Sequence, residues 1–254
     1  GTERYLPGLA AIAAGQGKSV FASGSGDPVE LLGINNRVEL ANLENIQRRR
    51  IRERLMLEGV TISNPDSVTI DADVTIAKDT VILPNTLILG DTVIGSGCEV
   101  GPGSVIKSSV IGDDCRITLS VVENAVMEST SDIGPFSHLR PGAYLESGVH
   151  IGNYVEVKES HFATGATMGH FGYIGDAFIG TNANVGAGTV TCNYDGKEKH
   201  RTIVEKEAFV GCDTMLVAPV RVGAKAITGA GAVVTKDVPP AGLVVGVPAR
   251  IRSG

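Results

Sequence analysis

The sequence has few aromatic residues and few cysteines, and it has no tryptophan. Among its 254 residues 4% are aromatic and four are cysteine. Four cysteines without a C-x-x-C pair are too few for a disulfide scaffold and lack the spacing of a zinc site. They predict reduced thiols and therefore a cytoplasmic protein.

The sequence also lacks a long apolar run and an excess of positive charge. A membrane span needs about 20 mostly apolar residues, and the longest apolar stretches, 6–14 and 241–249, are much shorter. The 22 Lys and Arg residues are outnumbered by 28 Asp and Glu residues, which gives a net charge of −6. We therefore expect a soluble protein that binds neither a membrane nor nucleic acid.

What the sequence does have is 33 glycines and a repeat with a period of six residues. Glycine often follows the aliphatic residue of the repeat, and a small residue such as Cys98 or Ser104 stands four positions beyond it. The longest uninterrupted series of aliphatic residues is Ile70, Ile76, Ile82, Ile88, Ile94, Val100 and Ile106.

A period of six fits neither an α-helix nor a hairpin meander. It suits a chain that turns a corner every six residues, so that three sides close one triangular coil of about 18 residues. The aliphatic residue then points inward, the small residue fits the narrow interior, and glycine permits the tight turn. We predict an all-β fold, a parallel β-helix of roughly nine or ten coils, with Cys98 and Cys115 packed inside it.

A different pattern precedes the repeat. Residues 37–58 carry apolar side chains at the spacing of one helical face, and Gly59 is typical of a helix end. We predict a long α-helical arm here, with its arginines on the solvent side. The apolar residues that carry this prediction are Leu40, Leu43, Ile46, Ile51 and Leu55.

The largest departure from the repeat, residues 191–206, predicts an extruded loop with an Asp-Gly turn. Coils just before it should place cations and polar groups on one stretch of surface, with Arg140 as a bidentate fork and Lys158 and Lys199 as point charges for a phosphate. Among these cations His170 is the natural general base, although a lone histidine in a coil is more often an ordinary surface residue. The other histidines lack metal-ligand spacing, so we expect no metal site.

These residues also carry a specific resemblance. The segments Leu139–Gly142, Gly152–Lys158, Gly169–Asp176 and Asn184–Gly196 are similar to the C-terminal acetyltransferase portion of a bifunctional bacterial family. That family, GlmU, joins an N-acetylglucosamine-1-phosphate uridyltransferase to a glucosamine-1-phosphate N-acetyltransferase within the hexapeptide-repeat acyltransferase superfamily. The resemblance covers nearly the whole chain and implies the left-handed form of the β-helix.

By this resemblance the chain transfers acetyl from acetyl-CoA to the amine of glucosamine 1-phosphate, for UDP-N-acetylglucosamine, peptidoglycan and lipopolysaccharide precursors. It implies a homotrimer with active sites between subunits, and His170 as general base with Glu156 nearby. The implied sugar-phosphate contacts are Arg140, Lys158, Tyr173, Asn184, Asn193 and Lys199. The implied coenzyme A contacts are Ala187, Asn193, Tyr194, Cys212, Ala230 and Arg250, the last either on a phosphate or in a solvated basic tail.

The resemblance further implies three regions. They are the end of an N-terminal uridyltransferase domain at 1–36, a linker arm helix at 37–59 and the β-helix acetyltransferase domain at 60–254. The glycine-rich Gly-x-Gly-Thr-x-Met opening of the uridyltransferase is absent, so we expect no uridyltransferase activity in this chain.

Three positions near the expected chemistry depart from the family's pattern. Cys212 stands where serine is common, Thr167 where lysine is common, and Gly172 where threonine is usual. We expect these three departures to affect the coenzyme A contacts and the reaction rate more than the class of reaction. Two alternatives remain open, namely an acyltransferase for another amino sugar or sugar nucleotide, and a non-catalytic trimeric scaffold.

Overall fold

The computed structural model describes residues 7–21, 23–24 and 26–252, in two compact units, Gly1–Ile46 and Gln47–Gly254. The parts of the predicted regions that fall on residues 1–6, 22, 25, 253 and 254 lie outside the described residues. The helices are α1 (Gly8–Gly15), η1 (Pro28–Leu31), α2 (Arg37–Leu57) and η2 (Pro65–Ser67). No described helix is both long and apolar enough to cross a membrane.

The helix predicted at 37–58 is confirmed as α2, which has 21 residues. Asn36 caps its start, because the side-chain oxygen accepts hydrogen bonds from the amides of Val38 and Glu39, each 3.0 Å long. The chain leaves the helix through Gly59, whose φ of 98° suits glycine.

The last turns of α2 pack on the solenoid and do not stand apart as an arm. Ile51 and Leu55 belong to the same buried cluster as Val68 of the first coil. The expectation that all arginines of this helix face solvent is wrong for Arg52, which is buried and donates to the Val68 carbonyl at 3.1 Å and to Asp66 at 3.0 Å. The hydrogen bonds explain how a charged group is tolerated at this end of the core.

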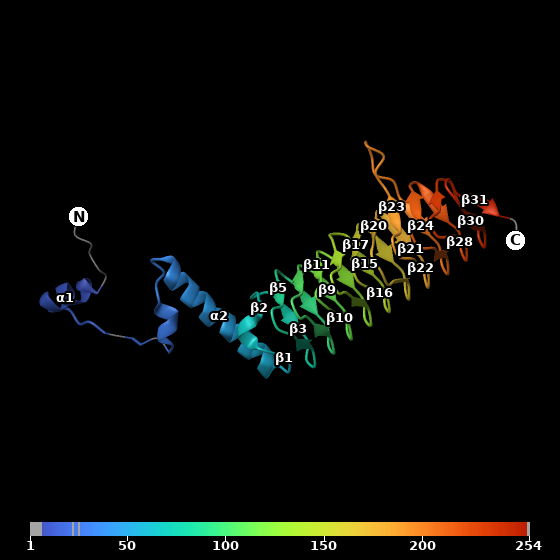
Figure 1. Ribbon diagram of the computed structural model, residues 1–254. Helices are drawn as coiled ribbons and strands as arrows, with labels where there is room; N and C mark the ends of the chain where they lie inside the picture. Colours follow the sequence, from blue (N-terminus) through green and yellow to red (C-terminus); the bar gives the residue numbers. More distant parts are fainter. Residues whose placement is uncertain (1–6, 22, 25, 253–254) are drawn as a thin grey trace. The chain divides into compact units, whose positions relative to one another are not determined.

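From Thr61 onward the second unit is a solenoid of short strands in three sheets (Figure 1). Each complete coil contributes one strand to sheet A, then one to sheet B and one to sheet C. Neighbouring strands are parallel, apart from the antiparallel pair that ends sheet A. The predicted class, a parallel β-helix preceded by an α-helix, is confirmed, and its left hand is the one that the resemblance implies.

The strand bounds follow the repeat. Sheet A contains β1 (Thr61–Ile62), β4 (Val81–Ile82), β7 (Glu99–Val100), β10 (Arg116–Ile117), β13 (Asp132–Ile133), β16 (His150–Ile151), β19 (Thr167–Met168), β22 (Asn184–Val185), β25 (Phe209–Val210), β28 (Ile227–Thr228), β30 (Leu243–Val245) and β31 (Arg250–Arg252). Sheet B contains β2 (Thr69–Ile70), β5 (Leu87–Leu89), β8 (Val105–Lys107), β11 (Val121–Glu123), β14 (His138–Leu139), β17 (Val155–Lys158), β20 (Gly172–Gly175), β23 (Val190–Cys192), β26 (Met215–Val217) and β29 (Val233–Val234). Sheet C contains β3 (Thr75–Ile76), β6 (Val93–Ile94), β9 (Val110–Ile111), β12 (Val126–Met127), β15 (Tyr144–Leu145), β18 (His161–Phe162), β21 (Ala177–Ile179), β24 (Thr202–Val204) and β27 (Val220–Val222).

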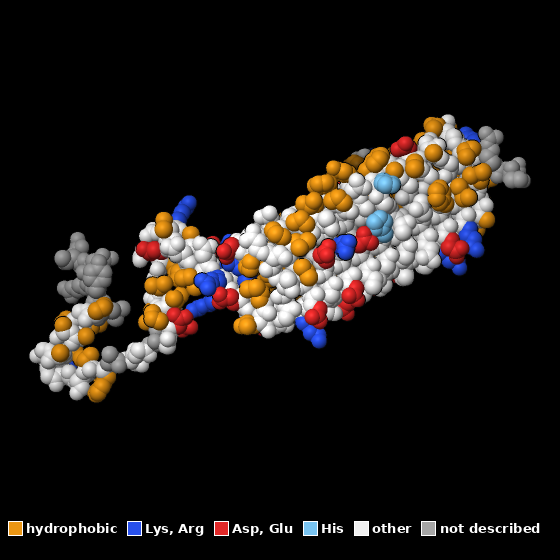
Figure 2. All heavy atoms as spheres, turned by 60° about the horizontal axis from the view of Figure 1, so that its bottom comes forward, with side chains coloured by type: hydrophobic (Ala, Val, Ile, Leu, Met, Phe, Trp, Pro, Cys, Tyr) orange, Lys and Arg blue, Asp and Glu red, His pale blue; other side chains and the backbone are white. Residues whose placement is uncertain are grey.

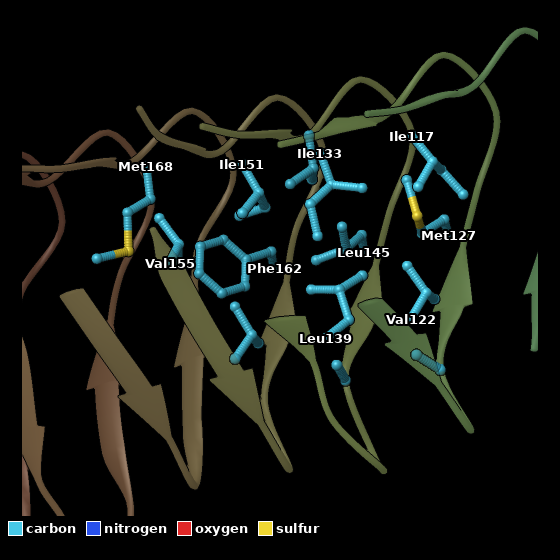
Figure 3. Close-up of a cluster of buried hydrophobic side chains, with 14 of the residues drawn as sticks. Ile117, Val122, Met127, Ile133, Leu139, Leu145, Ile151, Val155, Phe162 and Met168 are labelled. Atoms are coloured by element: carbon cyan, nitrogen blue, oxygen red, sulfur yellow. The ribbon is translucent and has the colours of Figure 1, made fainter. Parts of the chain in front are cut away.

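The interior of the solenoid is filled as the repeat predicts. Aliphatic residues of successive sides point inward and stack coil on coil (Figure 3). Cys98 and Cys115 are each 1% exposed, and each thiol donates a weak hydrogen bond of 3.1 Å to a carbonyl, that of Gly112 and that of Glu128. Their predicted role as small core residues is confirmed.

The glycine after the aliphatic residue has a different role from the one predicted. Gly112 and Gly186 do not have a left-handed backbone; instead, an added Cβ would lie 2.6 Å from the Ser129 nitrogen and 2.7 Å from the Cys212 nitrogen of the next coil. Positive φ occurs at other corner residues, such as Asp114 at 55°. At these two positions glycine therefore permits close stacking of coils, and the prediction that it permits the turn is wrong.

Replacing Gly112 by alanine is expected to lower the thermal unfolding midpoint. The added methyl group would have to displace the backbone of Glu128 and Ser129, and overpacking of this kind destabilises by about 1–3 kcal/mol. Gly33→Ala is the matched control, because a Cβ at Gly33 meets nothing within 4 Å. Thermal unfolding followed by circular dichroism measures both variants, and equal midpoints would contradict the stacking role.

Candidate active site

The outward face of sheet B brings together several of the predicted acceptor contacts. Arg140 directly follows β14, Lys158 ends β17 and Tyr173 lies in β20. Glu156 is in register with Tyr173 in the next coil. The Arg140 guanidinium donates to the Glu156 carboxylate at 2.7 Å, and this hydrogen bond raises the pKa of Arg140. The face therefore carries a fixed cation that is held by an adjacent carboxylate.

The predicted extruded loop is a hairpin between β23 and β24, which projects where the chain passes from sheet B to sheet C (Figure 1). Asp195 organises this hairpin. Its carboxylate accepts from the amides of Lys197 and Glu198, each at 2.8 Å, and pairs with the His200 ring at 2.7 Å. These bonds, the one from the Glu198 backbone most of all, lower the pKa of Asp195. The carboxylate stays ionised and keeps the hairpin in shape.

Asn193 anchors the base of the hairpin to sheet B. It is 8% exposed, and its side-chain amide donates to the Asp176 carboxylate and to the Tyr173 hydroxyl, the latter at 3.5 Å. The hairpin also brings Lys199 close to Lys158, and this neighbouring amine lowers the pKa of Lys158. Two amines so close together favour an anionic ligand.

Asp176 is a further residue of this face, which sequence reasoning missed. Its carboxylate ties the hairpin to the sheet through Asn193, and its charge acts on both Lys158 and Lys199. The sequence feature that could have identified Asp176 is its position directly after the strand of Tyr173, where an acidic residue stands among residues expected to form a cationic surface.

His170 lies between β19 and β20, where the chain turns from sheet A to sheet B, a position that we call the A–B corner. Its side chain is exposed and has no hydrogen-bond or ion-pair partner among the described residues. The other four histidines pair with carboxylates at 2.7–2.9 Å, as His138–Glu123, His150–Asp132, His161–Glu146 and His200–Asp195. The ring nitrogens of these four histidines are engaged by carboxylates, so among the five histidines His170 has the ring that is open to a ligand.

Three predicted coenzyme A contacts occupy the same corner position as His170 in successive coils. We call this row the corner line; it consists of His170, Ala187, Cys212 and Ala230. Backbone hydrogen bonds stack the corners, for example from the Asp213 amide to the Ala187 carbonyl at 2.6 Å and from the Gly231 amide to the Cys212 carbonyl at 2.8 Å. The small side chains above His170 leave an open strip for an extended ligand.

Arg250 lies beyond the C-terminal end of the corner line. It is exposed and belongs to β31, where it pairs with Val245 of β30. The Val245 side chain in turn lies against Gly229, which precedes Ala230 of the corner line. The structure therefore places this guanidinium beyond the last member of the row.

Two predicted residues do not join the others within one chain. Asn184 lies in β22 of sheet A, whereas Tyr173 lies in sheet B. The expectation that all the acceptor residues share one stretch of surface is therefore wrong for a single chain, because the corner between the sheets separates them. Tyr194 lies in the hairpin, at the far edge of sheet B from the corner line, and is 61% exposed.

An exposed apolar row extends the A–B corner toward the N-terminal coils. Its members, which are 37–61% exposed, are Leu119, Phe136, Tyr154 and Phe171. The rings of Phe136 and Tyr154 stack with their centroids 5.3 Å apart. Figure 2 shows hydrophobic side chains in a line along one edge of the solenoid, beside a face on which acidic and basic side chains alternate. A continuous apolar row at the surface indicates an interaction site.

Residues 7–21, 23–24 and 26–252 contain no group of three or more His, Cys, Asp or Glu side chains arranged to hold a metal ion.

The family model described as bacterial transferase hexapeptide (six repeats) matches residues 73–108. The chain is 46% identical over 205 residues to a bifunctional protein GlmU of Syntrophomonas wolfei and 48% identical over 243 residues to one of an Exiguobacterium species. These alignments cover 81% and 96% of this chain but 46% and 54% of the relatives. The chain thus spans about half the length of the curated relatives it matches.

Among solved structures the fold is similar to that of the UDP-N-acetylglucosamine acyltransferase of Francisella novicida. The TM-score is 0.53 at 19% identity, over 76% of this chain and 70% of that one. The repeat, the three-sheet solenoid and the family match define the chain as a hexapeptide-repeat transferase. Within that class it belongs to the family of the bifunctional protein GlmU, as 46% and 48% identity over 81% and 96% of the chain show.

Proposed function

We propose that this chain transfers an acetyl group from acetyl-CoA to the amine of glucosamine 1-phosphate, giving N-acetylglucosamine 1-phosphate. One observation carries the proposal. The histidine without a carboxylate partner, His170, lies at the corner that leads into sheet B, the sheet whose outward face carries Arg140, Lys158 and Tyr173. Relatives that are named bifunctional protein GlmU support the same assignment.

The proposed reaction needs a proton acceptor and a cationic site. The amine attacks the thioester carbon, a C–N bond forms, and the imidazole of His170 accepts the proton that the amine loses. The C–S bond breaks, and the departing thiolate takes up a proton to give free coenzyme A. Backbone N–H groups at the glycine-rich corners are suited to stabilise the negative charge that develops on the thioester oxygen.

The sugar phosphate is proposed to bind on sheet B. Arg140 offers a planar fork to the phosphate, and Lys158 and Lys199 add two further donors from the sheet and the hairpin. Glu156 holds Arg140 in place through their 2.7 Å hydrogen bond. A dianionic phosphate would relieve the repulsion between the two lysines.

The coenzyme is proposed to lie along the corner line. Ala187, Cys212 and Ala230 project little beyond the backbone, so that an extended chain can approach the corner, with its thioester end toward His170. Arg250 lies beyond the other end, where a phosphate of the coenzyme would find a cation. This arrangement fits an acyl donor that is long, narrow and negatively charged at its far end.

A homotrimer with active sites between subunits would complete the proposed site. Triangular solenoids that meet at their A–B corners would bury the apolar row and leave a wedge between sheet B of one copy and sheet A of the next. Asn184 of the second copy would then face Tyr173 of the first. The hairpin, at the outer edge of sheet B, would stand at the mouth of the wedge. Sedimentation velocity should show a trimer, and a monomer would contradict this arrangement.

The release of free coenzyme A from acetyl-CoA tests the proposal. Glucosamine 1-phosphate and plain glucosamine are compared as acceptors, and pyrophosphate release from UTP is followed in parallel. We expect rapid thiol release that depends on the phosphorylated acceptor, with no reaction of UTP. No release with either acceptor would overturn the proposal and favour a scaffold.

A further inference from the structure

Thr167 and Asn184 occupy matching positions in neighbouring coils of sheet A. Thr167 lies in β19 and Asn184 in β22, and the register of the two parallel strands pairs them directly. Both side chains are half-buried and alternate with buried core residues, so they stand on the outer face. The Thr167 hydroxyl donates a 3.1 Å hydrogen bond to Oδ1 of Asn184.

This hydrogen bond sets the direction of the Asn184 amide. A side-chain amide has an acceptor oxygen at one end and two N–H donors at the other. A hydroxyl that donates to Oδ1 therefore keeps Nδ2 turned away from Thr167. In the next coil the register pairs Asn184 with Phe209, an exposed ring without a hydrogen-bond acceptor. Within the described part of the chain Nδ2 has no acceptor of its own.

In the preceding coil no described residue forms a second hydrogen bond with the Thr167 hydroxyl. His150 is in register with Thr167, but its Nδ1 pairs with Asp132 at 2.7 Å. Sheet A thus carries a polar row that ends in two unengaged N–H groups, and the row becomes apolar at Phe209.

We propose that Thr167 is a positioning residue that aims the N–H donors of Asn184 at an oxygen of the acceptor substrate, the sugar phosphate. The inference rests on the proposed function, because it takes Asn184 to contact that substrate. The Thr167 hydroxyl is engaged by Asn184 and does not itself touch the substrate.

Thr167→Val tests the hydroxyl, because valine keeps the branched shape and removes the donor. We expect KM for glucosamine 1-phosphate to rise about 3- to 10-fold, as for the loss of one hydrogen bond, while kcat and KM for acetyl-CoA change little. Thr167→Ser should restore the native KM. Thr75→Val, at an exposed threonine of β3 in sheet C, is the matched control and should change neither constant.

The Asn184→Ala background separates positioning from general damage. Asn184→Ala should raise the same KM, and adding Thr167→Val should raise it no further, because the two residues act through one amide. An equal effect of Thr167→Val in both backgrounds, an unchanged KM in the native background, or no effect of Asn184→Ala would each overturn the inference while acetyl transfer stands. Failure of the unmodified protein to acetylate glucosamine 1-phosphate would instead overturn the proposed function.

Discussion

Replacing His170 by alanine is expected to lower kcat for acetyl transfer at least about 100-fold, the usual size of the loss of a general base. An alkylammonium group is not a nucleophile until it loses a proton, and the exposed, unpaired imidazole of His170 is the group suited to accept it. The initial rate of coenzyme A release with both substrates saturating measures the effect. A kcat near that of the native protein would contradict the assignment.

Two controls separate the loss of a base from loss of the fold. His170 makes no hydrogen bond to a described side chain, so His170→Ala should leave the thermal midpoint nearly unchanged. His161→Gln is the matched variant, because His161 lies on sheet C and pairs with Glu146 at 2.7 Å, away from the sheet B face. It should keep the native kcat. Added imidazole should restore part of the rate of His170→Ala only if the lost group acts as a base.

The fold could be predicted because its information is local and repeated. Each inward aliphatic residue, such as Ile82 or Ile88, is read from its own hexad, and a solenoid coil contacts only its neighbours. The repeat does not show how closely the backbones of successive coils approach each other. The sequence therefore does not reveal that Gly112 has to be glycine because of the Ser129 backbone in the next coil.

The site was predictable in its residue types and only partly in its arrangement. Arg140, Lys158 and Tyr173 do share a face, because the spacing between them keeps each on the same side of its coil. Asn184 lies on another side, in sheet A. The six-residue register slips along the chain, so counting residues from Tyr173 does not predict which of the three sheets contains Asn184.

The six-residue repeat does not predict which side chains of different coils contact each other. The pairing of four histidines with carboxylates, which singles out His170, joins mostly residues 15 or 18 positions apart. The bond from Thr167 to Asn184 spans 17 positions. Such contacts depend on side-chain direction across neighbouring coils, and they become visible only when the coils are stacked.

Arg140→Ala is expected to raise KM for glucosamine 1-phosphate about 30- to 100-fold, since truncating one partner of a hydrogen-bonded charge pair is strongly unfavourable. The variant removes the fork for the phosphate and also leaves the Glu156 carboxylate unpaired beside it. Arg140→Lys should recover only part of the affinity, because an ammonium cannot bind two oxygens in parallel. Steady-state kinetics with varied acceptor measure both variants. Arg116→Ala is the matched control on sheet A, where Arg116 pairs with Glu99 at 3.5 Å.

The same variant decides between the proposed acceptor and another amino sugar. A fork that binds phosphate contributes nothing to an acceptor without phosphate, so Arg140→Ala should leave the weak reaction with plain glucosamine nearly unchanged. Equal losses with both acceptors would mean that Arg140 supports the sheet B face, through its bond to Glu156, and does not bind phosphate. If glucosamine is the better substrate of the native protein and Arg140→Ala changes neither constant, the cations of sheet B serve another ligand and the acceptor is an unphosphorylated amino sugar.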